Sequence, residues 1–406
     1  MQDILDVARQ PEFDTGIIRW TYHPYTPYNT LTINPSDEVR ICINNQDLLT
    51  LPSQSYLYIK GKVDNKDNGH FIKNGLAFLF DEIRYEIASR EVDSVRNPGM
   101  ASLMKYMCTV PANSAKRYTN ALMDTDNNLK KISSNGEFSG CIPMEMLLGV
   151  FEDFDKVLVN VKQELVLKMA RNSLNAVYTT ATAPAAGVAD SIPEITISEI
   201  QWFMPHILAS DKEKLTLYKT VNSSKPFHIK FRSHELHEMP SYPTSTTKHT
   251  WAVKTTSQVE TPRYVILGFQ TSRDNAARKR CDEFDSCTLK NAKVFLNSEY
   301  YPYADMNLDF EKNDVSKAYE MFVRLQQSYQ NMLSEPIIDR EEFAKKYPLI
   351  AIDCSKQNEA IKEGVIDMRI EIETSANMTA GTKAYCLIIH NKQFEYDPSL
   401  NTVSRV

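Results

Sequence analysis

The chain has 406 residues, of which 42% are hydrophobic and 24% charged, enough for two or three ordinary globular domains. Its formal net charge of −6 and pI of about 5.8 argue against a protein that coats nucleic acid electrostatically. No apolar run approaches the roughly 20 residues of a membrane-spanning helix, and the first residues lack a signal-peptide pattern, so we expect no transmembrane segment and no secretion.

Alternation of apolar and polar residues predicts β-strands along most of the chain. In chain order, it covers residues 39–43, 57–63, 77–87, 157–169, 227–231, 292–303 and 366–372. A strict period of two indicates strands with one buried and one solvated face, which is typical of antiparallel sandwiches and not of parallel α/β sheets. The sequence therefore predicts an all-β fold of two tandem eight-stranded jelly-roll β-sandwiches with short helical insertions.

Amphipathic helices interrupt the strands at similar places in the two halves. In the first half, the turn Asn97-Pro98-Gly99 precedes Met100, Leu103, Met104 and Met107 at helical spacing. In the second half, Asn313 and Asp314 are candidate caps for a helix over 315–333. Its buried face is expected to carry Tyr319, Phe322, Leu325 and Tyr329. Its solvent face is expected to carry Lys317, Arg324, Gln327 and Gln330. Asp339 is a candidate cap for a helix over 340–347. The repeated order of strand, helix and strand indicates a duplicated building block.

A linker divides the two halves. Residues 178–193 read YTTATAPAAGVADSIP, a stretch that is nearly uncharged and too poor in large apolar residues to build a core. We therefore expect an N-terminal jelly roll over 1–178, a linker over 179–193 and a C-terminal jelly roll over 194–406.

The cysteines indicate neither a disulfide framework nor a zinc site. They stand at positions 42, 108, 141, 281, 287, 354 and 386, and the nearest pair is six residues apart. Zinc ligands usually come in pairs two to four residues apart, with further ligands elsewhere. We interpret all seven as reduced thiols of a cytosolic or nuclear protein.

Other candidate motifs also have simpler explanations. The run SHELHE at 233–238 places its histidines three residues apart and not four as a zincin helix requires, so we expect loop residues there. Four further histidines are isolated and interpreted as packed or surface residues: His23, His206, His249 and His390. Cys354 has no neighbouring base, and the basic run 278–280 is followed by acidic residues, as in a solvated loop. We therefore predict no catalytic, cofactor-binding or metal-binding residues and no cofactor.

Several runs of the sequence resemble a known family. The run FLFDEIRYEIASREVDSVRNPGMASLMKYM at 78–107 is similar to the first jelly roll of double jelly-roll major capsid proteins of eukaryotic DNA viruses and virus-like elements, of the Polinton and adintovirus type. The run IPEITISEIQWFMPHI at 192–207 looks like the start of their second jelly roll. KHTWAVKTTSQVETPRYVILGFQT at 248–271 and LKNAKVFLNSEYYPY at 289–303 are also similar, and the likeness extends from about residue 16 to 390.

This resemblance implies a structural protein of the virion and not an enzyme. Three chains are expected to form a pseudo-hexameric homotrimer that contacts neighbouring capsomers in an icosahedral shell around double-stranded DNA. A single jelly-roll penton protein is expected at the vertices, DNA contact is expected to be weak and non-specific, and assembly is expected in the host nucleus or cytoplasm. The alternative from the residues alone is a cellular ligand- or glycan-binding protein with tandem β-sandwiches.

Overall fold

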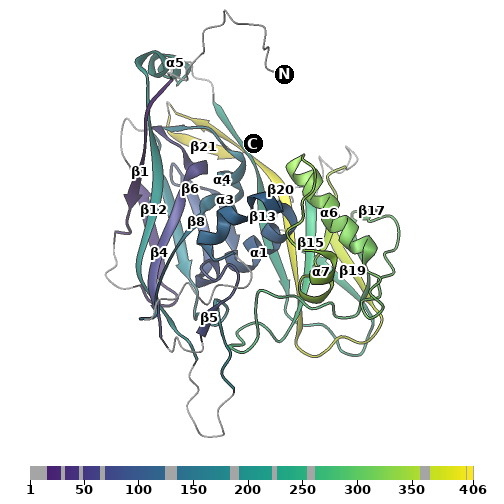
Figure 1. Ribbon diagram of the computed structural model, residues 1–406. Coiled ribbons are helices and arrows are strands. Elements are labelled where there is room, and N and C mark those ends of the chain that lie inside the picture. Colours follow the sequence, from purple (N-terminus) through teal and green to yellow (C-terminus); the bar gives the residue numbers. More distant parts are fainter. Residues whose placement is uncertain are drawn as a thin grey trace, which may run out of the picture.

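The computed structural model describes residues 16–28, 33–44, 49–64, 69–123, 135–182, 192–221, 226–253, 261–356, 366–398 and 400–405. Most of the expected linker, at 183–191, lies outside the described residues. Two β-sandwiches stand side by side, with helices between them and along one side (Figure 1).

The first sandwich consists of two antiparallel sheets, which we call sheets 1 and 2. Sheet 1 contains β1 (Ile17–Tyr25), β12 (Ile195–Ala209), β4 (Tyr56–Val63) and β8 (Glu137–Pro143), with the short β3 (Leu49–Thr50) beside β12 and β9 (Leu158–Val159) beside β3. Sheet 2 contains β2 (Glu38–Ile43), β10 (Gln163–Met169), β6 (Phe80–Ile87) and β7 (Arg90–Arg96). A small separate pair joins β5 (Gly69–Phe71) and β11 (Val177–Thr179).

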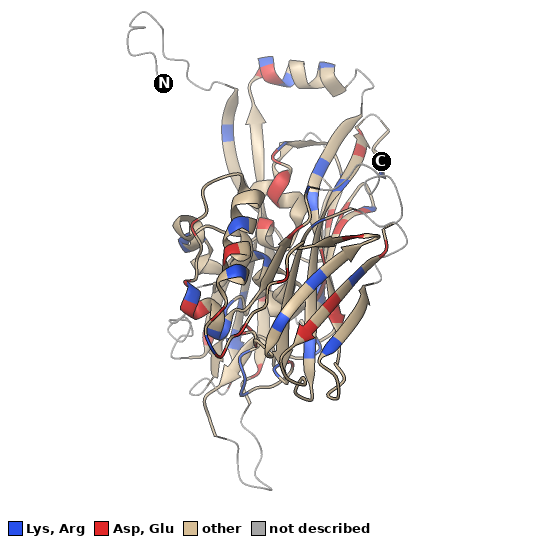
Figure 2. Ribbon diagram, turned by 90° about the vertical axis from the view of Figure 1, so that its right-hand side faces the viewer, with Lys and Arg blue, Asp and Glu red and all other residues tan. Residues whose placement is uncertain are grey.

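The second sandwich consists of sheets 3 and 4. Sheet 3 contains β13 (Phe227–Met239), β20 (Thr382–Asp397), β15 (Pro262–Thr271) and β18 (Ile350–Asp353), and β21 (Thr402–Arg405) pairs with β20. Sheet 4 contains β14 (Lys248–Val253), β19 (Met368–Thr374), β16 (Leu289–Leu296) and β17 (Glu299–Tyr301). On the outer side of sheet 4, basic and acidic residues alternate, with Lys290 paired to Glu373 and Arg369 to Glu371 (Figure 2).

The two sandwiches share one connectivity. When the eight main strands of each are counted in chain order, sheets 1 and 3 both read first, eighth, third and sixth, and sheets 2 and 4 both read second, seventh, fourth and fifth. This is the order of a jelly roll, in which the chain alternates between two packed sheets. The predicted pair of eight-stranded jelly rolls and the duplicated building block are confirmed.

The alternation in the sequence corresponds to the two faces of each sheet. Val39, Ile41 and Ile43 of β2 point into the first core, and Trp202 of β12 lies at its centre against Tyr85 and Phe151. Sheet formation is favoured here because branched and aromatic side chains pack well on a pleated surface. The expected strands at 157–169 and 292–303 are each broken in two, because Asn160 and Asn297 adopt left-handed backbone conformations that strand geometry does not allow.

One sequence-based assignment is corrected by the sheet pairing. Residues 195–209 were expected to begin the C-terminal jelly roll at 194–406, but β12 is hydrogen-bonded to β1, β3 and β4 and is the eighth strand of the first sandwich. The alternating pattern of a strand does not say which partner strands it joins. We propose that the division between the jelly rolls lies at α5 (Asp211–Val221), between β12 and β13.

Helices are inserted between the fifth and sixth strands of both jelly rolls. In the first, α1 (Pro98–Thr109) is capped by the Asn97 side chain, and the short α2 (Ala112–Ala115) follows it. In the second, α6 (Ser316–Gln330) and α7 (Arg340–Lys346) occupy the equivalent connection, and Asp339 caps α7 as expected. The expected caps Asn313 and Asp314 are wrong for α6, because Val315 is the N-cap and Asp314 is bridged to Asp309 in the preceding turn.

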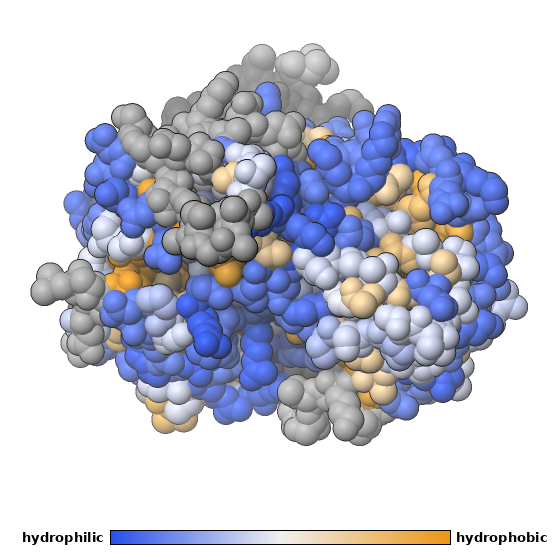
Figure 3. All heavy atoms as spheres, turned by 90° about the horizontal axis from the view of Figure 1, so that it is seen from below, coloured by the Kyte–Doolittle hydropathy of each residue, from blue (hydrophilic) through white to orange (hydrophobic). Residues whose placement is uncertain are grey.

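The remaining helical turns connect strands. They are α3 (Met144–Leu147), α4 (Gly149–Asp153) and the 3₁₀ turns η1 (Pro52–Gln54), η2 (Ala77–Leu79) and η3 (Lys116–Ala121). No helix among the described residues is both long and apolar enough to cross a membrane. The face at the β5 end of the molecule is mainly hydrophilic where the structure describes it, with smaller apolar areas between the polar ones (Figure 3).

Candidate assembly surfaces

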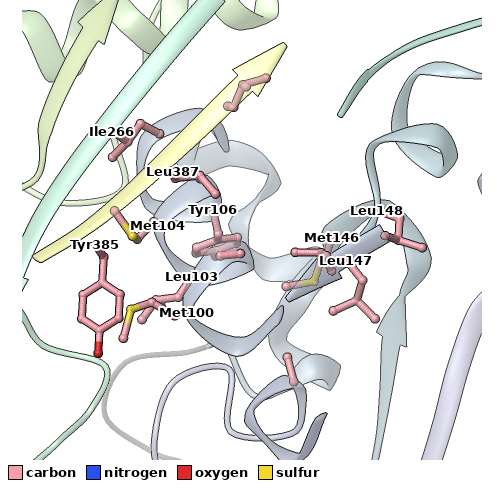
Figure 4. Close-up of a cluster of buried hydrophobic side chains, with 14 of the residues drawn as sticks. Met100, Leu103, Met104, Tyr106, Met146, Leu147, Leu148, Ile266, Tyr385 and Leu387 are labelled. Carbon is pink, nitrogen blue, oxygen red and sulfur yellow. The ribbon is translucent and has the colours of Figure 1, made fainter. Parts of the chain in front are cut away.

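The junction between the two jelly rolls is built around helix α1. Met100, Leu103 and Met104 project from α1 toward Tyr385 and Leu387 of β20, and all five side chains are buried (Figure 4). Burial of apolar area contributes roughly 25 cal/mol per Å², so large side chains in such a junction oppose separation of the sandwiches. The helix that the sequence predicted therefore belongs to the contact between the jelly rolls.

The helical insertions of the two jelly rolls also meet directly. The Gln326 side chain of α6 donates a hydrogen bond to the carbonyl oxygen of Val110 at 2.7 Å, and Gln330 donates to that of Thr109 at 3.1 Å. The last carbonyl groups of a helix have no partner within the helix, and these amides satisfy two carbonyls at the end of α1. The expectation that Gln330 points to solvent is wrong for this reason.

An ion pair joins α4 of the first jelly roll to β13 of the second. The Arg232 guanidinium donates from Nε to Asp153 Oδ2 at 2.8 Å and from Nη2 to Oδ1 at 2.5 Å. It also lies 3.8 Å from the centre of the Tyr329 ring and donates to the Tyr329 carbonyl oxygen. Burial disfavours the charge, but the hydrogen bonds that the guanidinium donates to Asp153 outweigh this effect and raise the pKa of Arg232. This paired geometry fixes orientation as well as distance.

A close backbone contact accompanies this ion pair. A Cβ atom at Gly149, the first residue of α4, would stand 1.7 Å from the carbonyl oxygen of Arg232. Only glycine permits α4 to approach β13 so closely. Next to this contact, Asp93 of β7 is buried and accepts hydrogen bonds from Ser233 Oγ at 2.5 Å and Val150 N at 3.2 Å.

A further connection between the jelly rolls involves the basic run at 278–280. Asp282 is fully buried, pairs with Arg280 at 2.6 Å and accepts a hydrogen bond from the backbone of Lys73 in the first jelly roll at 3.0 Å. The Lys73 ammonium lies over the Tyr347 ring, and burial lowers the pKa of Lys73 to about 8 against the opposing charge of Asp282. The expected solvated loop is therefore wrong for Arg280, which is part of a packed contact between the jelly rolls.

One exposed surface of the first jelly roll is aromatic, and we call it the β1 aromatic face. It comprises Trp20, Tyr22, Tyr56, Phe203 and Ile207. The register places Trp20 opposite Ile207, while Tyr56 stacks on Phe203 at 4.8 Å and contacts Tyr22 at 5.5 Å. Trp20 and Tyr22 are 43% and 45% exposed. Strand β1 lies at the edge of sheet 1, and an apolar edge strand is a favourable site for contact with another chain.

The histidines of the candidate metal motif lie inside a strand. Residues 233–238 belong to β13, so the expected loop is wrong, and His234 and His237 point to opposite faces because they are an odd number of residues apart. They cannot bind one ion together.

A second histidine pair lies on β1 and β12. His206 stacks on His23 at 4.0 Å and forms a hydrogen bond with the Tyr25 hydroxyl. Burial is the main cause, and the charge of His23 the second cause, that lowers the pKa of His206 to about 4.

The cysteines are all free thiols. Cys354 is buried, and this burial raises the pKa of its thiol, which disfavours the nucleophilic thiolate. Among the described residues, no three His, Cys, Asp or Glu side chains are grouped as metal ligands.

Two jelly rolls of identical strand order, fixed side by side by buried contacts, define a double jelly-roll protein. A family model for the double jelly roll-like domain matches residues 70–394, and the chain belongs to this family. No curated protein matches the sequence.

Solved viral structures have the same fold at very low sequence identity. A chain in the cryo-EM structure of the Sputnik virophage is 9% identical with a TM-score of 0.64, over 99% of this chain and 91% of that chain. The Faustovirus major capsid protein is 9% identical with a TM-score of 0.62, over 96% and 92%. The mavirus major capsid protein is 10% identical with a TM-score of 0.60, over 99% and 92%.

Proposed function

We propose that the chain is the structural major capsid protein of a virion. The observation that carries this proposal is the identical strand order of two jelly rolls that buried contacts hold side by side. Membership of the double jelly roll-like family and the fold of the mavirus and Faustovirus major capsid proteins support it. The protein acts through its surfaces, and no residue has a catalytic role.

The capsomer in this proposal is a homotrimer. Three chains supply six similar sandwiches, so a closed ring of three has a nearly hexagonal outline. The contact within such a ring is heterologous, because the first jelly roll of one chain faces the second jelly roll of the next. Interfaces of permanent assemblies usually bury more than about 2,000 Å².

The β1 aromatic face is our candidate for part of this contact, because its aromatic side chains suit the buried centre of an interface.

The trimers tile an icosahedral shell around double-stranded DNA, with a single jelly-roll penton protein at the vertices. Assembly takes place in the host nucleus or cytoplasm. The buried contacts between the jelly rolls are important in this proposal because the outline of the capsomer depends on the angle between them.

Negative-stain imaging of the purified chain tests the proposal. We expect compact pseudo-hexagonal particles, and we expect Trp20→Glu to disperse them because a charge would be buried at the interface. Gln327→Glu, on the exposed side of α6, is the control and should leave them intact. Small single particles from the unmodified chain would instead support a ligand-binding tandem sandwich.

A further inference from the structure

A basic depression crosses three neighbouring strands of sheet 3. It has a volume of about 680 Å³ and lies between α4 and the strands β13, β15, β20 and β21. The charged residues that line it are Lys230, Arg232, Arg263, Lys392, Arg405 and the single carboxylate Asp153. The chain as a whole carries a net charge of −6, so this excess of positive charge opposes the general balance of the surface.

The strand register brings several hydrogen-bond donors to one face of the sheet. Lys230 stands opposite Gln393 and Arg232 opposite Asn391, and opposed residues of an antiparallel pair point to the same side. Arg263 of β15 donates to the Asn391 side chain at 3.3 Å from the other side of β20. Cationic and amide groups therefore form one continuous row over β13, β20 and β15.

Internal ion pairs neutralise only part of this positive charge. Arg232 is held by Asp153, and the Lys392 ammonium is 3.7 Å from the buried Asp93. Neither Lys230 nor Arg263 has an acidic side chain within 4 Å in the part of the chain that the structure describes. Further along the same pair of strands, Glu395 stands opposite His228, and the two side chains lie 3.5 Å apart. Two cations thus remain available to an external anion.

We propose that this basic depression binds phosphate groups. Guanidinium groups match phosphate oxygens in geometry and charge, the ammonium group adds a mobile point charge, and the two amides supply further donors. A hollow lined by one sign of charge also concentrates the field that attracts an anion. The phosphate can belong to a free polyphosphate or to the backbone of a DNA duplex, and binding does not depend on capsomer assembly.

Fluorescence anisotropy with a labelled 20-base-pair DNA duplex and calorimetry with tripolyphosphate test this inference on the full chain. The key variant is Lys230→Gln with Arg263→Gln. The matched control is Lys317→Gln with Arg324→Gln on the exposed side of α6, which changes the net charge equally. Thermal melting of both variants checks that they are folded.

We expect the key variant to lose roughly tenfold in affinity and the control to change less than about twofold, because the charge acts locally. With about three phosphate contacts, duplex affinity should fall about 40-fold between 50 and 200 mM salt. Binding of the duplex alone would identify the DNA backbone as the source, and binding of tripolyphosphate alone would identify a free phosphate compound. Absence of binding to both at 50 mM salt, or equal losses in the two variants, would overturn the proposal.

Discussion

Removal of the Asp153 carboxylate tests whether the jelly rolls are held together by buried charge. Asp153→Ala leaves the Arg232 guanidinium without its paired acceptor, between α4, β13 and α6. Breaking one partner of a buried ion pair typically costs about 3–5 kcal/mol. The side chains of Arg232 and Asp153 are 20% and 19% exposed, so we expect a cost at the lower end of this range, about 3 kcal/mol.

Calorimetric unfolding measures this effect. For a unit the size of one jelly roll, each kcal/mol lowers the Tm by about 2–4 °C, so we expect a decrease of about 9 °C. Arg232→Met in the same chain should restore part of the loss, because the thioether side chain can pack on the Tyr329 ring without a buried charge. Arg324→Ala, which breaks an exposed pair with Glu320, is the control and should cost less than about 0.5 kcal/mol.

The outcome that would refute this reasoning is specific. If Asp153→Ala lowers the Tm no more than Arg324→Ala does, the ion pair does not hold the jelly rolls together. If the double variant with Arg232→Met is no more stable than Asp153→Ala alone, the cost does not come from an unpaired guanidinium.

Two further predictions concern the helical insertion and the pH dependence of stability. Phe322→Asp places a carboxylate beside Tyr319 and Phe343 at a site that is 2% exposed, so we expect the free energy of unfolding to fall by about 4 kcal/mol and the yield of assembled particles to fall with it. Gln327→Asp on the solvent side of α6 is the control and should be tolerated. Normal assembly of Phe322→Asp would contradict the assigned buried face. The pKa of His206 falls from 6.5 to about 4 on folding, so the unfolded chain binds a proton at this ring more readily than the folded chain does. The contribution of the neutral His206 ring to folding stability is therefore complete above pH 6.5 and is lost as the pH falls toward 4. His206→Gln should therefore reduce the decrease in Tm over that range, and an unchanged pH profile would count against a half-buried neutral ring.

Local patterns in the sequence predicted the elements that depend on local physics. The alternation of β2, β4, β13 and β19 was visible because one face of each strand is buried and the other is polar. Helices α1 and α7 were visible because capping residues precede their apolar positions. In each of these cases, the signal lies within a few residues.

Long-range pairing was not accessible in the same way. The membership of β12 in sheet 1 depends on partners as distant in sequence as β1 and β4, and its own alternation is the same for either sandwich. Arg232 and Asp153 are 79 residues apart, and a charged residue on the outer side of a strand looks solvated until a helix covers it. Acidic residues close to the run 278–280 were the only signal of the contact made by Asp282, and they fit a solvated loop equally well.

The mass of the purified protein in solution tests the central claim most directly. Light scattering across a wide range of concentration should give three times the chain mass of 46.5 kDa, because the two jelly rolls of one chain supply two sixths of a closed pseudo-hexameric ring. A mass that stays at 46.5 kDa at every concentration would contradict the assignment as a capsomer-forming protein.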